Sequence, residues 1–249
     1  MDINAKDNIG ATALWWASKE RHWQVVKLLL ATPGVDVNAN VELRAMYDER
    51  ETSLHHAVQQ GKERIIQLLL SKKTLNPNIP DSWKWTPLCY AADKGSTNIV
   101  SLLLKNANTL VDPLGREQPS ALWVAASAGQ AEVVKQLLQH PPVNINYKSC
   151  WGETALLAAA REGRIDVIKI MLDDKRVQLN ARDSDGRTAL WWAAYNGRIQ
   201  LVRLLLQDRR VGVNTGDYHG VDPTKAAKDE GYSEIVQLLW NAFGQNNYE

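Results

Sequence analysis

The string TALWWAS at residues 12–18 returns almost unchanged as TALWWAA at residues 188–194. Its pair of adjacent tryptophans stands out because the chain of 249 residues holds ten Trp and one Phe. Such a string is either a chemical site present in two copies or one building block of a repeated structure. The spacing of related strings along the chain decides between these interpretations.

Related strings recur at a fixed spacing. The first step between equivalents of the threonine is 40 residues, and every later step is 34. Glycines from Gly61 to Gly231 keep the same 34-residue step, and Arg21 holds the first slot of that series. Copies that keep these markers in register predict a repeat architecture over the whole chain. The equivalents of the threonine are Thr12, Thr52, Thr86, Ser120, Thr154, Thr188 and, in degenerate form, Asp222.

Each copy has the pattern of two short helices. In the third copy, residues 86–95 (TPLCYAADKG) predict a first helix that Thr86 caps and Pro87 begins. Gly95 predicts a left-handed turn at the end of that helix. Residues 96–106 (STNIVSLLLKN) predict a second helix with a wide apolar face.

This pattern resembles the ankyrin repeat. The resemblance rests on T-P/A-L-x-x-A-A followed by glycine, on second helices that end in L-L-L, and on strings such as VDVN at residues 35–38. It implies an all-α ankyrin-repeat solenoid of about seven helix-turn-helix repeats with β-turn fingers, and the array is similar to fungal ankyrin-repeat proteins. A single domain, residues 1–249, would hold repeats at about 7–38, 39–78, 79–112, 113–146, 147–180, 181–214 and 215–249, the last a C-terminal cap.

The histidine of the family's TPLH signature is mostly replaced. An indole N–H at this position still donates one hydrogen bond, whereas a leucine cannot. Trp15 and Trp191 are therefore interpreted as packing between repeats, because tryptophan buries a large apolar area. Only His55 keeps the histidine, and the replacements are Trp15, Cys89, Trp123, Leu157 and Trp191.

The two ends of the array differ. The last copy carries Lys225 and Lys228 at slots that are apolar or aromatic elsewhere, as expected of a terminal repeat with a polar outer face. We expect Trp240 and Phe243 to fold back onto the preceding helices. The first copy has no obvious polar cap, so the chain is either the tail of a longer array or a small protein whose first repeat caps adequately. The six extra residues between the first two copies fall in the loop at residues 39–51, which is either a contact loop or a tolerated surface loop.

Composition and motifs argue against several classes of protein. The net charge of +1 gives no basic excess for nucleic acid, and no apolar run is long enough to span a membrane. Two cysteines, Cys89 and Cys150, imply no disulfide framework and fit a reducing compartment, so we expect an intracellular protein, cytoplasmic or nuclear. Because metal-binding, nucleotide-binding and nucleophile motifs are absent from the sequence, no catalytic residue, cofactor or metal is predicted, and the protein is expected not to be an enzyme. Acidic residues in the finger loops are interpreted as turn residues that bond nearby backbone N–H groups.

Binding is the function that the pattern favours. The resemblance implies a non-enzymatic protein-protein interaction module or scaffold whose partner, a protein of unknown identity, meets the finger tips and the residues before each mid-repeat glycine. Exposed tryptophan and tyrosine are residue types that anchor interfaces. Carrying these positions onto the chain selects Trp83, Trp85, Asp93, Lys94, Arg116, Glu117, Trp151, Glu153, Arg161, Arg187, Tyr195, Tyr218 and His219.

Several alternatives stay open at this point. One alternative is a ligand-sensing C-terminal tail of a larger fungal receptor-like protein. Another is a small-molecule binder or enzyme that uses the tryptophan-rich groove. Weak self-association through the first repeat is a further alternative. A deep, enclosed pocket with several convergent polar groups would favour a small-molecule site, and an open groove would favour an interaction module.

Overall fold

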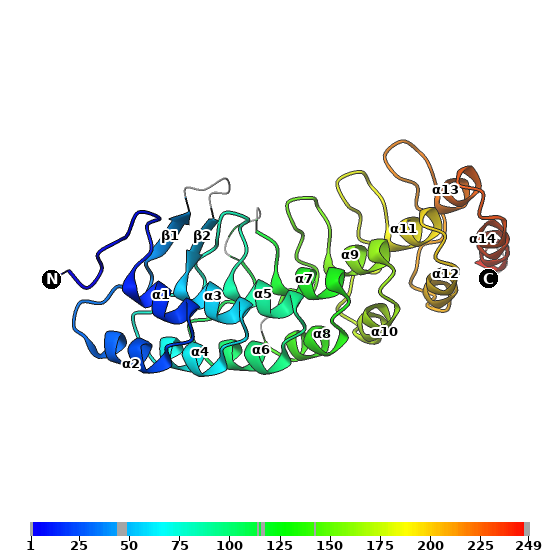
Figure 1. The fold of residues 1–249 in the computed structure, drawn as a ribbon. Coiled ribbons are helices and arrows are strands. Elements are labelled where there is room, and N and C mark those ends of the chain that lie inside the picture. The colour runs from blue at the N-terminus through cyan, green and yellow to red at the C-terminus, as the bar shows by residue number, and fades with distance from the viewer. Residues whose placement is uncertain (1, 44–48, 114, 116–117, 142, 247–249) are drawn as a thin grey trace. The chain divides into compact units, whose positions relative to one another are not determined.

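The computed structural model of the protein describes residues 2–43, 49–113, 115, 118–141 and 143–246. The chain divides into two compact units, Met1–Ala121 and Leu122–Glu249. Each unit consists of pairs of short antiparallel helices, with a loop that projects ahead of the first helix of each pair (Figure 1). We call these projecting loops fingers.

The first unit places its helices in two rows. Within each row, helices one repeat apart contact each other, so every pair packs against the next (Figure 1). The row next to the fingers holds α1 (Ala13–Lys19), α3 (Ser53–Gln59) and α5 (Pro87–Asp93), and the outer row holds α2 (Trp23–Ala31), α4 (Glu63–Leu70) and α6 (Thr97–Leu104).

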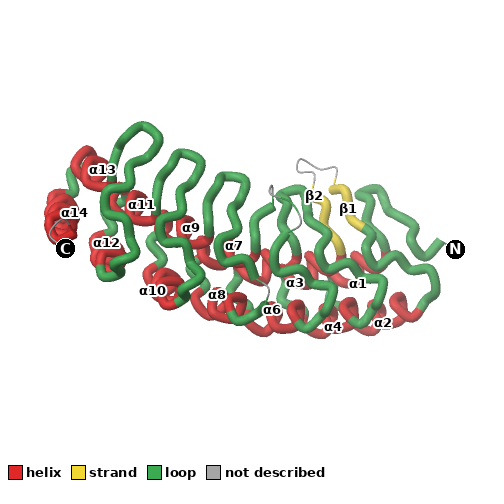
Figure 2. The backbone as a smooth tube through the Cα atoms, turned by 180° about the vertical axis from the view of Figure 1, so that it is seen from behind, coloured by secondary structure: helices red, strands yellow, loops and turns green. Residues whose placement is uncertain are grey.

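The second unit repeats this arrangement (Figure 2). Its α7 starts at the last residue of the first unit, and α14 is the longest helix among the described residues. The helices next to the fingers are α7 (Ala121–Ala128), α9 (Ala155–Glu162), α11 (Ala189–Tyr195) and α13 (Pro223–Asp229), and the outer ones are α8 (Ala131–Leu138), α10 (Ile165–Asp173), α12 (Ile199–Leu206) and α14 (Ser233–Asn246).

Local chemistry starts and ends these helices as the sequence predicts. The Thr86 hydroxyl accepts the N–H of Cys89, Pro87 occupies the first turn of α5, and Gly95 has φ +67°. Asp222 caps α13 in the same way by accepting the N–H of Lys225, which confirms it as the degenerate marker. Arg21 adopts the left-handed conformation, with φ +65°, where the later repeats use glycine.

The side chain at the histidine position of the TPLH signature forms a hydrogen bond to the next repeat. The residue that forms it differs among three repeats. His55 Nε2 lies 3.2 Å from Trp85 O, the Cys89 thiol 3.5 Å from Pro119 O, and Trp191 Nε1 donates to Val221 O at 2.9 Å. The acceptor is in each case the carbonyl just before the next helix cap. Trp191 is 5% exposed, so its interpretation as packing between repeats is confirmed.

Trp15 also packs against the next repeat. It is 2% exposed, contacts Ala11 and Val41, and lies with its ring 5.4 Å from that of His56. Its indole N–H has no hydrogen-bond partner among the residues that the structure describes. The packing interpretation is confirmed here too, but the hydrogen bond that Trp191 makes is missing.

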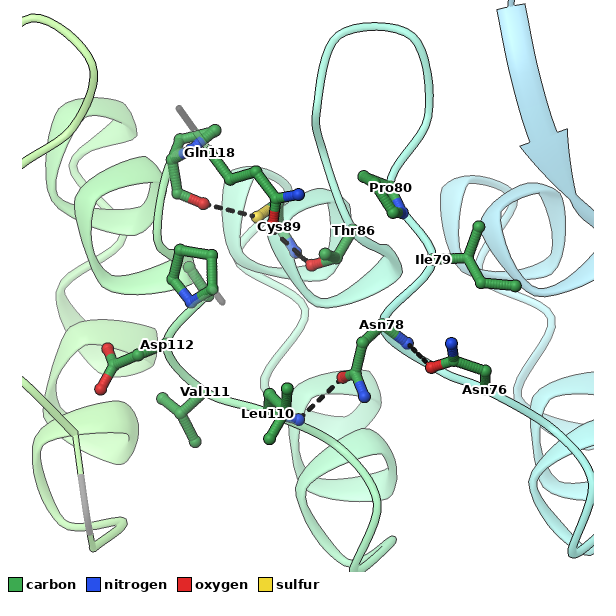
Figure 3. A pocket seen from close by; sticks show the side chains of 13 residues that line it. Asn76, Asn78, Ile79, Pro80, Thr86, Cys89, Leu110, Val111, Asp112 and Gln118 are labelled. Carbon is green, nitrogen blue, oxygen red and sulfur yellow. Dashed lines mark hydrogen bonds between the residues drawn. The ribbon is translucent and has the colours of Figure 1, made fainter. Parts of the chain in front are cut away.

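Asparagine side chains join successive repeats on the opposite side of the first helices from the finger tips. Asn78 Nδ2 donates to Asn108 O at 2.7 Å. Asn78 Oδ1 accepts the N–H of Leu110 at 2.8 Å, a bond that Figure 3 shows. The amide thus pairs both of its ends with backbone of the next repeat. Asn4, Asn38, Asn146 and Asn180 make the same two bonds.

One feature was not predicted and one expectation needs correction. The segment at residues 39–52 contains two antiparallel strands, β1 (Asn40–Leu43) and β2 (Glu49–Thr52), while residues 44–48 lie outside the described part of the chain. Trp240 and Phe243 do not fold back: they are 69% and 43% exposed, because α14 buries its opposite face, with Leu239, against the preceding helices.

The asparagine bonds predict a measurable loss of stability. We expect Asn78→Ala to lower the free energy of unfolding by about 1–3 kcal/mol, because two hydrogen bonds of about 0.5–1.5 kcal/mol each are lost. Urea denaturation followed by circular dichroism measures this change. Asn98→Ala, an exposed position on α6, is the matched control and should change stability by less than about 0.5 kcal/mol. Equal losses in the two variants would contradict the role of Asn78.

Candidate functional site

An aspartate at the start of the finger closes several of the finger turns. In the sixth finger (residues 181–187), Asp183 Oδ1 accepts the backbone N–H groups of Asp185 and Arg187 at 2.9 and 2.8 Å. Asp7 does the same in its finger, and Asp81 Oδ1 accepts the backbone N–H of Trp85 at 2.8 Å. The interpretation of these acidic residues as turn residues is confirmed.

The same aspartates also accept a hydrogen bond from an aromatic side chain on the following helix. Asp183 Oδ2 accepts Trp192 Nε1 at 2.9 Å, Asp7 accepts Trp16 Nε1 at 2.7 Å, and Asp81 accepts the Tyr90 hydroxyl at 2.5 Å. Each donor lies four residues after the helix-capping threonine. The sequence analysis did not foresee this bond, although the nine-residue spacing between acid and aromatic was visible.

The fifth finger (residues 147–153) lacks this bond. Ser149 stands in the aspartate slot and Ala158 in the aromatic slot. The Ser149 hydroxyl, which is buried, has no hydrogen-bond partner within the described residues. Arg161 of α9 pairs with Glu153 of this finger.

A cavity of about 420 Å³ opens beside this pair, entirely within the second unit. We call it the Trp151 cavity. Helices α7, α9 and α11 each contribute one side chain to it, and the fifth and sixth fingers contribute the rest. Its lining residues are Trp123, Trp151, Glu153, Arg161, Asp183, Ser184, Asp185, Arg187 and Trp192.

Glu153 is a buried carboxylate whose partners are Arg161 and Trp123. The residue is 6% exposed, and Arg161 Nε lies 3.1 Å from Glu153 Oε1. Burial raises the pKa of Glu153 above its usual value, although the Arg161 guanidinium opposes that rise. Arg161 is shared with Glu162, whose Oε1 lies 3.6 Å from its Nη2. The negative charge of Glu153 is therefore only partly compensated.

Aromatic rings form the rest of the wall. The ring of Trp151, which is 55% exposed, stacks on that of Trp123 with centroids 5.4 Å apart. On the other side, the Arg187 guanidinium lies 4.7 Å from the Trp191 ring and 5.0 Å from the Trp192 ring. Arg187 Nη1 also pairs with Asp185 Oδ2 at 2.9 Å.

Backbone hydrogen bonds hold the fingers of the second unit together. Ser184 N donates to Trp151 O at 3.3 Å, and Tyr218 N donates to Asp185 O at 2.9 Å. The Arg182 guanidinium lies 4.8 Å from the Tyr218 ring. The exposed Trp151 and Tyr218, on the fifth and seventh finger tips, are thus each fixed to the sixth finger, which lowers the entropy that a partner would have to remove on binding.

The structure brings together four of the selected residues, Trp151, Glu153, Arg161 and Arg187, around the Trp151 cavity. Nearby, Tyr195 stacks on Trp191 with centroids 5.0 Å apart. Tyr218 and His219 are exposed on the seventh finger (residues 215–221). The selection missed Trp123, Asp183 and Trp192. The 34-residue step places Trp123 and Trp192 on the first helices of the fourth and sixth repeats, but it gives no sign of which ring lines a cavity.

The selected residues of the first unit lie on other surfaces. Trp83 is 63% exposed, and Trp85 is half-buried with its ring 5.1 Å from that of Tyr90. Asp93 and Lys94 are exposed at the end of α5, where Lys94 Nζ donates to Gln59 O. Arg116 and Glu117 lie outside the described residues.

A second hollow, of about 310 Å³, lies in the first unit near Cys89 (Figure 3). Its walls include Ile79, Leu110 and Val111. Burial raises the pKa of the Cys89 thiol, so this sulfur is held protonated and is a poor nucleophile. In the part of the chain that is described, no three His, Cys, Asp or Glu side chains gather as metal ligands would, and no helix has the length and apolarity to cross a bilayer.

Paired helices with a capped start, a left-handed residue and a projecting finger define a helical-repeat protein. The family model for ankyrin repeats (3 copies) matches residues 39–112, 107–183 and 175–248, and the model for the single ankyrin repeat matches residues 9–40. The chain belongs to the ankyrin-repeat family. The predicted all-α ankyrin fold is confirmed, with the β1–β2 hairpin as an addition.

A curated relative carries similar repeats. The chain is 39% identical over 70 residues to the probable E3 ubiquitin-protein ligase XBOS33 of Oryza sativa subsp. japonica. That alignment covers 28% of this chain and 12% of the rice protein. The similarity therefore concerns a short stretch of repeats, and ankyrin repeats in general serve as protein-binding modules.

The packing of the finger tips predicts different effects of two glycine substitutions. Gly186 and Gly231 both have positive φ, +84° and +82°, so alanine should cost either site about 1–2 kcal/mol. A Cβ at Gly186 would also lie 2.9 Å from the Tyr218 ring, whereas one at Gly231 meets nothing within 4 Å. We expect Gly186→Ala to lower the free energy of unfolding more than Gly231→Ala, as measured by urea denaturation. Equal losses would mean that the Tyr218 ring is not held against the sixth finger.

The electrostatics of Glu153 predict a pH-dependent stability difference from Glu153→Gln. Because the folded-state pKa of Glu153 is raised, folding favours its protonated form. Its contribution to stability is present below the unfolded pKa and is lost as the pH rises through the folded pKa. The stability of the wild type relative to Glu153→Gln, measured by urea denaturation, should therefore fall as the pH rises from the usual glutamate range through the raised folded-state pKa.

Glu51 occupies the equivalent slot of the second repeat and supplies a control of opposite sign. Burial alone would raise the pKa of Glu51, but hydrogen bonds from His56 and Gln59 outweigh it and hold the pKa below its usual value. The stability of the wild type relative to Glu51→Gln should therefore rise with pH, from the folded pKa up to the usual glutamate range. The same sign for both variants would contradict these assignments.

Proposed function

We propose that the protein is a non-enzymatic protein–protein interaction module that binds its partner at the Trp151 cavity and the neighbouring finger tips. The observation that carries this proposal is the exposed Trp151 ring beside a cavity whose fingers are fixed by backbone bonds. A large aromatic side chain held in place and half exposed is the residue type that anchors protein interfaces.

The remaining selected residues extend this surface. Tyr195, Tyr218 and His219 belong to the same unit as the cavity, and Tyr218 lies on the next finger tip. Trp83, Trp85, Asp93 and Lys94 form a separate candidate contact in the first unit. Two cysteines that form no disulfide accord with a reducing compartment, so we further propose an intracellular location.

A small-molecule site is the second candidate. The Trp151 cavity, at about 420 Å³, falls within the range of about 300–1,000 Å³ that is typical of ligand pockets. Its charged groups are already joined in ion pairs, Glu153 with Arg161 and Asp185 with Arg187, which supports recognition more than acid–base catalysis. The interaction module is favoured because an exposed finger-tip ring suits a macromolecule.

Affinity capture with matched variants tests the proposal. The intact chain, Trp151→Ala and Trp240→Ala serve as baits in the same lysate, after circular dichroism has shown equal helicity. Trp240 is the control because it is 69% exposed on α14 and does not line the Trp151 cavity. We expect at least one protein that the intact chain and Trp240→Ala retain and that Trp151→Ala loses by about tenfold or more.

Trp83→Ala, used as a fourth bait, separates the two units. Loss of the same protein with Trp83→Ala would extend the interface to the first unit, and retention would confine it to the second. Equal capture by all baits, or specific capture by none, would overturn the proposal.

A further inference from the structure

The lining of the Trp151 cavity has an excess of negative charge. Three carboxylates, from Glu153, Asp183 and Asp185, face two guanidinium groups, from Arg161 and Arg187. A fourth carboxylate, that of Glu162, also forms an ion pair with Arg161. An incoming cation would therefore reduce the local charge imbalance, whereas an incoming anion would increase it.

The partners of Glu153 differ from those of Glu51 at the same position of the second repeat. These glutamates occupy the same slot of their repeats, 102 residues apart in the sequence. Glu51 is bonded by Gln59 and lies 3.9 Å from His56 Nδ1, and its pKa is held low. Ala158 replaces that histidine in the fifth repeat, and Glu153 is held instead by Arg161, which approaches both of its oxygens, and by a hydrogen bond with Trp123. Because a carboxylate has about four acceptor sites, Glu153 retains capacity for a further donor beyond Arg161 and Trp123.

The aromatic wall suits the same kind of ligand. A cation over the face of a tryptophan is attracted by the ring quadrupole, and a planar guanidinium also stacks on it. The chain itself pairs arginine with aromatic rings, since Arg64 lies 3.3 Å from the Trp23 ring and Arg187 packs on Trp191. The Trp151 ring, 55% exposed at the mouth of the cavity, offers a surface of this type.

An acidic ligand fits the cavity less well. Each guanidinium is already committed, Arg161 to Glu153 and Glu162, and Arg187 to Asp185. A carboxylate or phosphate would have to displace one of these partners. It would also add negative charge beside Glu153, which is buried.

We propose that the Trp151 cavity receives a basic side chain of the protein partner, with arginine preferred to lysine. The guanidinium stacks on Trp151 and donates hydrogen bonds to the carboxylates of Glu153 and Asp185. This assignment rests on the proposed function and specifies the chemistry that the partner presents at its anchor point. Arginine is preferred because its planar fork both stacks on the ring and pairs with a carboxylate.

Short peptides test this assignment without knowledge of the partner. The probe is acetyl-Gly-Gly-Arg-Gly-Gly-amide, and its isosteres carry lysine or the neutral citrulline. Binding to the full-length chain is followed by the indole N–H signals of ¹⁵N-labelled protein, because tryptophan side chains line the cavity. We expect the arginine peptide to shift these signals and the lysine peptide to bind more weakly. The citrulline peptide should lose at least about tenfold in affinity relative to the arginine peptide.

Variants locate the peptide site. Glu153→Gln keeps the shape of the side chain and should weaken the arginine peptide about tenfold. Trp151→Leu, at a half-exposed position, removes the ring and should weaken it as well, and Trp240→Ala should leave it unchanged. Equal binding of arginine and citrulline peptides, or arginine binding that survives both Glu153→Gln and Trp151→Leu, would overturn the assignment.

The capture experiment separates this assignment from the proposed function. In one outcome, Trp151→Ala loses the partner, Glu153→Gln retains it, and the arginine and citrulline peptides bind equally. This outcome would contradict the basic-side-chain assignment but would still support the interaction module. Capture of no specific protein would remove the interaction module itself.

Discussion

Hydrogen bonds from each helix pair to the backbone of the next pair are the interactions on which the rest of the structure depends. Helices of seven to nine residues, such as α1 and α2, are too short to be stable alone in water. Stacking supplies the apolar burial, but stacking alone would let neighbouring pairs slide. The two-ended bonds of Asn78 and its equivalents fix the register, and the bond from Trp191 to Val221 O fixes it again at the next helix cap. Side chains 34 residues apart therefore occupy equivalent places.

That fixed register lets a substitution create a site without disturbing the backbone. The slot four residues after the helix cap holds Trp16, Tyr90 or Trp192 where a finger aspartate receives a hydrogen bond. When Ala158 and Ser149 replace the aromatic and the acid, the fifth finger still turns and still reaches its neighbour through Ser184 N and Trp151 O. What changes is the set of polar groups inside: Glu153 turns toward Arg161, and a cavity opens beside them.

The sequence predicted those features that depend on neighbours along the chain. The caps at Thr86 and Asp222, the left-handed Gly95 and the aspartate turns all involve atoms a few residues apart, so spacing alone reveals them. Whether a tryptophan is buried or exposed depends on the residues that pack against its ring in three dimensions. Trp15 and Trp16 are adjacent, yet one is buried and the other 37% exposed. The exposure of Trp240 and the pairing of β1 with β2 also depend on three-dimensional neighbours. For that reason the expectation that Trp240 folds back was wrong, and the pairing of the strands was not predicted.

The first unit shows why a partner's anchor would favour the second. The slot of Ala158 is filled there by His56, which lies beside Glu51, and by Tyr90, whose hydroxyl binds Asp81. A basic side chain brought to Glu51 would have to compete with the amide of Gln59 and with His56, and it would find no under-compensated carboxylate to pair with. Glu153 presents the same carboxylate in the same backbone setting, with Arg161 and Trp123 as its partners and with a pKa that burial raises. Two residues that share a slot are thus given different roles by the side chain five positions further on, a histidine in one repeat and a methyl group in the other.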